Sequence, residues 1–177
     1  MRLLKVLPNG DFHLTRKLLD NDITQYPYAI LSHTWGQENE EVTFEEMVEG
    51  SGRGKTGYEK IKFCGKEAVK EGLKYFWVDS CCIKKSSDAE LSESLNSMFR
   101  WYQRAAKCYV YLSDVSTSKR KRGDENALNM WEQAFRKSRW FTRGWTLQEL
   151  LAPTSVEFFS KEGNRLGDKQ SLQQQIP

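Results

Sequence analysis

The sequence predicts an α/β fold in which a parallel sheet, of the flavodoxin-like kind, carries helices on both faces. Three short apolar runs, at residues 28–32, 75–79 and 108–112, have the length and composition of buried strands. Stretches with helical periodicity separate these runs, and such alternation is typical of a parallel sheet. Ligands of these sheets bind beyond the carboxyl ends of the strands, so a site is expected in the loops that follow them.

A β-hairpin is expected ahead of the first of these strands. Residues 2–6 and 12–14 have strand character, and Asn9-Gly10 between them is a typical hairpin turn. After the first buried strand, residues 42–48 are expected to form a short helix. The glycine-rich, basic residues 50–57 are expected to form a loop. This loop does not complete a phosphate-binding motif, because Glu49 stands where that motif needs a glycine.

Three longer helices are expected between the strands and after the third strand. The clearest begins at Ser87, which has capping-box spacing to Glu90. Apolar residues follow it at helical spacing: Leu91, Leu95, Met98 and Tyr102. The other two helices are expected at residues 58–72 and 126–137.

The remaining segments are a basic loop, a fourth strand and a tail. Residues 117–124 include Lys119-Arg120-Lys121-Arg122 and are expected to form a solvated loop; a nuclear signal or phosphate patch is the alternative. A strand is expected at 156–159. The chain is expected to form a single domain over residues 1–177. Its tail at 169–173 resembles the first turn of a helix, so the chain is expected to be the N-terminal fragment of a longer protein.

Composition excludes several classes of function. The chain has 29% charged and 12% aromatic residues, as globular domains do, and its net charge of +3 is weak evidence for nucleic acid. The sequence has no apolar run long enough for a membrane span and no signal peptide, so a cytoplasmic protein is expected. Four cysteines without a Cys-x-x-Cys pair indicate neither disulfides nor a metal site. Only two histidines are available as general bases.

The segment at 138–153 carries the strongest chemical signal. Glu149 stands among large apolar residues, and desolvation of this kind tunes a carboxylate for chemistry. Pro153 is expected to end a short helix here. The alternative is a capping box from Thr146 to Glu149, in which the carboxylate serves only a backbone N–H.

Three stretches resemble the heterokaryon incompatibility (HET) domain of fungi. They are the AILSHTWG segment at 29–36, the FWVDSCCI segment at 76–83 and the RGWTLQELLAP segment at 143–153. All three occur in the family's order. The resemblance implies a domain that triggers cell death when non-self is recognised, joined to downstream nucleotide-binding and repeat regions.

The order of elements also resembles Toll/interleukin-1 receptor (TIR) domains. Ser138-x-Trp140 and the later Glu149-Leu are similar to the TIR pattern Ser-x-Trp-Cys-x-x-Glu-Leu, although Thr146 replaces the cysteine and the spacing is longer. In TIR domains that hydrolyse NAD, this glutamate is catalytic. The resemblance therefore implies Glu149 as the catalytic residue and NAD, or a related nucleotide, as substrate, with no further cofactor.

Other residues are expected to contact the nucleotide. The tryptophans would stack on a base, with packing in the core as the alternative for each of them. The loop after the first buried strand would meet the phosphates. Asp79 has the alternative role of holding the turn that follows it. The expected contacts are Ser32, His33, Thr34, Trp35, Gly36, Asp79, Trp140, Arg143 and Trp145.

Two other functions remain open at this point. The first is a hydrolase or transferase in which Cys81 or Cys82 is the nucleophile and His33 is its base. A cysteine at the end of a buried strand, however, more often serves only as a small apolar side chain in the core. Alternatively, the chain is an interaction module that assembles with copies of itself and has no activity. Self-association is compatible with the enzymatic function as well, because it would complete a site between two chains.

Overall fold

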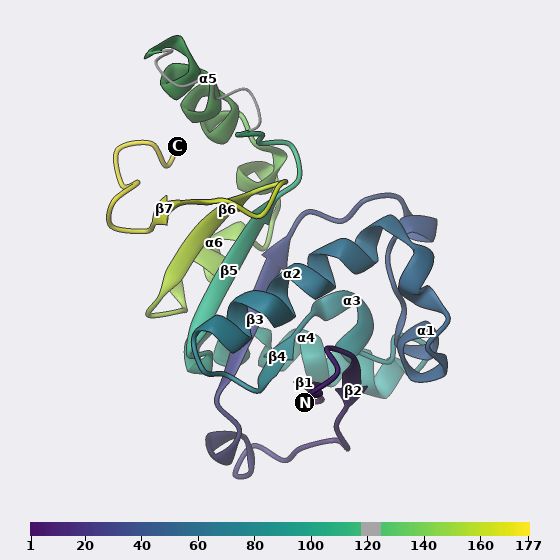
Figure 1. The fold of residues 1–177 in the computed structure, drawn as a ribbon. Helices are drawn as coiled ribbons and strands as arrows, with labels where there is room; N and C mark the ends of the chain where they lie inside the picture. Colours follow the sequence, from purple (N-terminus) through teal and green to yellow (C-terminus); the bar gives the residue numbers. More distant parts are fainter. Residues whose placement is uncertain (118–124) are drawn as a thin grey trace.

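A mixed sheet forms the centre of the molecule. The computed structural model describes residues 1–117 and 125–177, with side chains left out for 125–129. Within these residues the sheet has seven strands in the order β2-β1-β4-β3-β5-β6-β7 (Figure 1). The inner four strands are parallel: β3 (Tyr28–His33), β4 (Tyr75–Trp77), β5 (Lys107–Leu112) and β6 (Val156–Ser160). Their order, β4-β3-β5-β6, is that of the first four strands of a flavodoxin-like sheet, and the α/β prediction is confirmed.

The edges of the sheet depart from the parallel arrangement that was expected. The predicted hairpin is present as β1 (Leu4–Val6) and β2 (Phe12–Leu14), and β1 joins β4 in antiparallel orientation. At the other edge, β7 (Arg165–Asp168) pairs with β6 in antiparallel orientation. The chain reverses between β6 and β7 at Gly163, whose φ of 79° favours glycine.

The prediction of a helix start at 169–173 is wrong, because this segment forms turns. The Asp168 carboxylate accepts the backbone N–H groups of Gln170 and Ser171 at 3.0 and 2.8 Å. Side-chain bonds of this kind are found in turns as well as at helix starts, and here the chain continues as turns and not as a helix.

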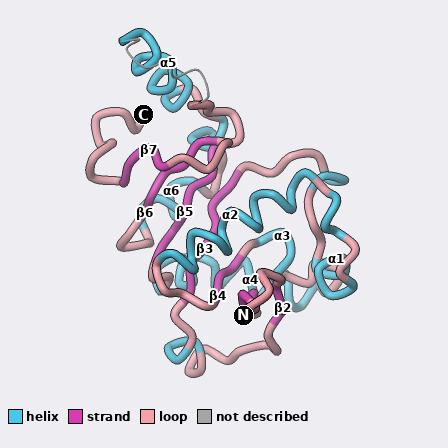
Figure 2. Tube along the Cα trace, viewed as in Figure 1, coloured by secondary structure: helices cyan, strands magenta, loops and turns pink. Residues whose placement is uncertain are grey.

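Helices cover both faces of the sheet. In Figure 1, α2 (Thr56–Lys70) lies over the front face, while α4 (Asp88–Arg104) and α6 (Thr146–Leu151) lie behind it. Figure 2 shows α5 (Glu125–Arg136) extending from the end of the sheet near the C-terminus. The other described helices are short: α1 (Phe44–Glu49), α3 (Asp79–Cys82), and the 3-10 helices η1 (Ile23–Gln25), η2 (Glu38–Glu40), η3 (Gly52–Gly54) and η4 (Arg139–Thr142). No helix in the described parts is long and apolar enough to cross a membrane.

The predicted helix starts are largely confirmed, with some local differences. Ser87 caps α4 by accepting the Glu90 N–H, but the Glu90 carboxylate binds Arg2 and so completes only half of the expected capping box. Leu95 is 43% exposed, whereas Trp101 is buried on that helix. The expected loop after β4 is the one-turn helix α3. The basic loop expected at 117–124 falls, apart from Thr117, outside the described residues.

Candidate functional site

The expected site residues gather in two clusters on opposite faces of the sheet. Successive side chains of a strand point to opposite faces, and this separates the adjacent Ser32 and His33 at the end of β3. We call the group on the α6 side the Glu149 cluster: Ser32, Trp140, Arg143 and Glu149. We call the group on the α2 side the His33 cluster: His33, Trp35, Glu41, Lys60 and Asp79.

In the Glu149 cluster, a buried carboxylate is held by one cation and one hydroxyl. Glu149 is 3% exposed, and the Arg143 guanidinium binds its two oxygens at 2.9 and 3.1 Å. The Ser32 hydroxyl donates to the same carboxylate at 2.5 Å and accepts the indole N–H of Trp140 at 2.7 Å. Burial lowers the pKa of Arg143, but the hydrogen bonds and charge of Glu149 outweigh this effect and raise it.

The capping-box interpretation of Glu149 is wrong. Trp145 stands at the N-cap of α6 without a side-chain cap, and the Thr146 hydroxyl donates to the Trp140 carbonyl. The Glu149 carboxylate binds Arg143 and Ser32, so its contacts are with other parts of the fold.

Trp140 lies in the core and has no exposed surface on which a base would stack. Its ring packs at right angles on Phe158 of β6, with 5.7 Å between ring centroids. The Ser138 hydroxyl fixes the turn before Trp140: it accepts the backbone N–H of Trp140 and donates to the Asp114 carboxylate at 2.7 Å. Trp140 therefore contributes to the site by orienting Ser32.

In the His33 cluster, each ring nitrogen of the buried His33 has its own hydrogen-bond partner. Lys60 Nζ lies 2.9 Å from His33 Nδ1, and His33 Nε2 lies 2.8 Å from Asp79 Oδ1. Lys60 also donates to Glu41 at 2.5 Å and to the Thr34 carbonyl at 3.3 Å. These bonds tie the loop after β3 to α2 and to the start of α3.

Asp79 anchors the exposed end of this cluster. Its second oxygen accepts the Trp35 indole N–H at 2.9 Å, so the carboxylate joins the last residue of β3 to the loop that follows it and does not cap α3. Burial alone raises the pKa of Asp79, but His33, Lys85 and Trp35 outweigh it and lower the pKa to about 2. The ammonium of Lys85 lies 4.4 Å from the centre of the Trp35 ring, where it covers part of the surface expected to stack on a base.

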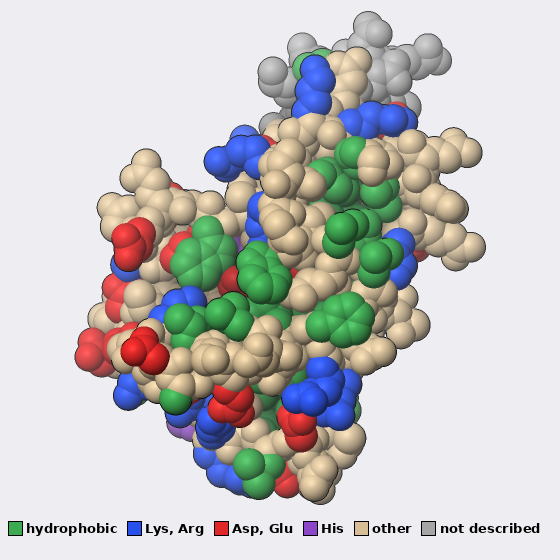
Figure 3. Space-filling view, turned by 180° about the vertical axis from the view of Figure 1, so that it is seen from behind, with side chains coloured by type: hydrophobic (Ala, Val, Ile, Leu, Met, Phe, Trp, Pro, Cys, Tyr) green, Lys and Arg blue, Asp and Glu red, His purple; other side chains and the backbone are tan. Residues whose placement is uncertain are grey.

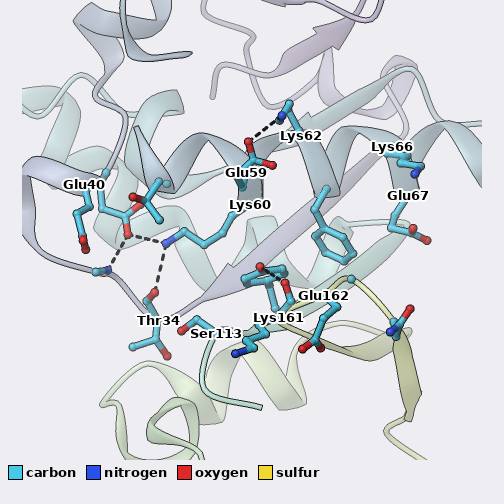
Figure 4. Close-up of a pocket in the computed structure, with 18 of the residues that line it drawn as sticks. Thr34, Glu40, Glu59, Lys60, Lys62, Lys66, Glu67, Ser113, Lys161 and Glu162 are labelled. Atoms are coloured by element: carbon cyan, nitrogen blue, oxygen red, sulfur yellow. Dashed lines mark hydrogen bonds and ion pairs between the residues drawn. The ribbon is translucent and has the colours of Figure 1, made fainter. Parts of the chain in front are cut away.

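A cleft of about 1030 Å³ opens beside the His33 cluster. It lies between α2, the ends of β3 and β5, and the β6–β7 turn, and Figure 4 shows Lys60 reaching across it from α2 toward Thr34. Thr34 and Gly36 line this cleft, but no residue of the Glu149 cluster does. Trp145 is 47% exposed on the outer side of α6.

The structure gives no support to a cysteine nucleophile. Cys81 and Cys82 are buried, and burial raises the pKa of the Cys81 thiol well above its usual value. Asp79 and Lys60 occupy the ring nitrogens of His33, the base that this mechanism requires. In the described residues, no three His, Cys, Asp or Glu side chains are placed to hold a metal ion.

Sequence reasoning missed two members of the His33 cluster, Lys60 and Glu41. Lys60 stands beside Ile61 on the buried stripe of α2, which continues through Cys64 and Ala68. A lysine is rarely buried unless it is paired, so its place on this stripe was a usable signal for an ion pair. Nothing local in the sequence marks Glu41 as the partner.

Comparison with known proteins agrees with this fold and these motifs. The family model described as "Heterokaryon incompatibility protein (HET)" matches residues 28–129. The chain is 55% identical over 176 residues to the vegetative incompatibility protein HET-E-1 of Podospora anserina, an alignment that covers 99% of this chain and 13% of that protein. No solved structure matches the chain. The chain belongs to the heterokaryon incompatibility (HET) family.

Proposed function

We propose that this domain is a cell-death effector of fungal non-self recognition and that it acts by hydrolysing NAD at Glu149. Membership of the HET family and the name of its relative support the biological role. The observation that carries the chemistry is the buried Glu149 carboxylate, held by Arg143 and Ser32 near the carboxyl end of the central strand β3.

The proposed reaction breaks the bond between the nicotinamide nitrogen and C1′ of the ribose. Water adds to C1′, and the products are nicotinamide, ADP-ribose and a proton. Nicotinamide leaves as a neutral molecule from a cationic ring, so the reaction needs no strong general acid. The Glu149 carboxylate would hydrogen-bond the ribose hydroxyls and stabilise the positive charge that develops on the sugar.

Arg143 has to release Glu149 before the ribose binds. It occupies both carboxylate oxygens, and only 19% of its side chain is exposed. A guanidinium displaced by the sugar is well suited to bind the diphosphate of the same nucleotide, because its N–H groups match phosphate oxygens. In this proposal Arg143 is a gate in the free protein and a phosphate ligand in the complex.

Nicotinamide release from NAD by the purified domain tests the proposal, at low and high protein concentration. Wild type should release nicotinamide and Glu149→Gln should release none, whereas Glu38→Gln, at an exposed position of η2, should match wild type. Release that rises more steeply than protein concentration would show that assembly activates the enzyme. Equal release by wild type and Glu149→Gln would refute the role of Glu149.

The second candidate function is a self-associating module without activity. Apolar side chains are exposed on the outer faces of two helices behind the sheet, the face shown in Figure 3: Trp145, Leu147 and Leu151 near α6, and Leu95 and Phe99 on α4. Folded wild type that releases no nicotinamide, together with concentration-dependent association that Leu147→Ser abolishes in sedimentation, would favour this function.

A further inference from the structure

Lys60 is a buried cation whose three donors all have acceptors. Its side chain is 10% exposed, and its ammonium contacts His33 Nδ1, Glu41 Oε1 and the Thr34 carbonyl. An ammonium has three N–H groups and cannot accept a hydrogen bond. His33 Nδ1 must therefore accept from Lys60, and the proton of the neutral ring must lie on Nε2, where it is donated to Asp79.

We propose that Lys60 is a positioning residue that fixes His33 as the neutral Nε2–H tautomer. In this form His33 orients Asp79, and Asp79 in turn holds the Trp35 indole. If the proposed function holds, the loop after β3 would therefore be fixed in place before the nucleotide binds.

The charges around His33 explain why Lys60 controls its proton. Asp79 at the start of α3 favours an imidazolium, and Lys60 on α2 opposes it, because a second cation would face the ammonium at 2.9 Å. Glu41 neutralises Lys60 from the other side, and Lys85 binds the carbonyls of Asp79 and Ser80. Removing the ammonium leaves the carboxylates of Asp79 and Glu41 near the ring, and both favour an imidazolium.

Glu41 links Lys60 to Gly36, at the far end of the loop after β3. The oxygen that binds Lys60 also accepts the Gly36 N–H at 2.7 Å. The start of α2 packs closely on this segment, since a Cβ at Gly57 would lie 2.5 Å from the Glu40 carbonyl. Close packing places Lys60 within reach of both ends of residues 33–36.

Nitrogen-15 NMR of the histidine rings tests the tautomer directly. The chain has two histidines, and the exposed His13 is an internal reference. At neutral pH, wild type should show an unprotonated Nδ1 and a protonated Nε2 for His33. In Lys60→Met both nitrogens should be protonated, whereas Lys62→Met, at an exposed position of the same helix, should match wild type.

Two NMR results would overturn the proposal: a protonated Nδ1 in wild type, or a wild-type pattern in folded Lys60→Met. The first measurement needs no variant, so it decides the tautomer even if Lys60→Met does not fold. In the nicotinamide assay, Lys60→Met should raise KM several-fold with kcat little changed; unchanged KM would refute the positioning role. Absence of any release by wild type would refute the proposed enzyme and leave the tautomer result standing.

Discussion

Replacing Arg143 by methionine should destabilise the fold strongly, because it leaves a buried charge without its counter-ion. Glu149 is 3% exposed, and after the change only the Ser32 hydroxyl would bind its carboxylate. Removing one partner of a buried ion pair costs about 3–5 kcal/mol. Since 19% of the Arg143 side chain is exposed, we expect the lower end, about 3 kcal/mol, in the free energy of unfolding.

Urea denaturation at pH 7, followed by tryptophan fluorescence, measures this loss. The double variant Arg143→Met/Glu149→Gln has no buried charge at this site and should be more stable than Arg143→Met alone. Arg139→Met is the control, because that side chain is 69% exposed and its ion pair with Asp114 is long, at 3.9 Å; it should cost roughly 0.5 kcal/mol or less. A loss below about 1 kcal/mol for Arg143→Met, or no recovery in the double variant, would refute the reasoning.

Two further predictions concern the partners of these clusters. Asp79→Asn should lose roughly 1–3 kcal/mol at pH 7, because a neutral amide replaces the carboxylate that accepts hydrogen bonds from both His33 and Trp35. The pKa of Asp79 is lowered from 3.8 to about 2. A lowered pKa stabilises the fold above the unfolded value, so the difference from wild type should disappear as pH falls from about 4 through 2 in urea titrations. Trp140→Phe should cost about 2–4 kcal/mol in the same assay, because it removes volume from the core and the donor to Ser32; a loss under about 1 kcal/mol would contradict that contact.

Local sequence signals predicted the elements well where one short segment decides the structure. Asn9-Gly10 marked the hairpin, Ser87 marked the start of α4, and the apolar runs marked the parallel strands. The antiparallel strand β7 was missed, because turns around Gly163 and Asp168 decide its place and the tail alone looked helical. The residues of β7, Arg165-Leu166-Gly167-Asp168, also lack the apolar run that marked the parallel strands.

The candidate site was harder to predict, because its contacts join residues that are far apart in the sequence. Ser32 and Glu149 are 117 residues apart, and only the fold shows that they share a hydrogen bond. Lys60 and Glu41 carry no motif, and they are recognised by the burial of two opposite charges. The alternation of side chains along β3 was a usable signal for the two clusters, because the adjacent residues 32 and 33 must face opposite sides of the sheet.

This alternation constrains how a nucleotide would bind. A ligand confined to the cleft beside α2 would meet Thr34 and Gly36 but not Glu149. The charge of Asp79, as well as that of Glu149, contributes to the raised pKa of Arg143. In the proposed reaction the nucleotide must therefore lie across the carboxyl edge of the sheet, where Arg143 lies within the electrostatic reach of both carboxylates. Movement of Arg143 away from Glu149 would expose the carboxylate that we propose to be catalytic and would place a cation at that edge in a single step.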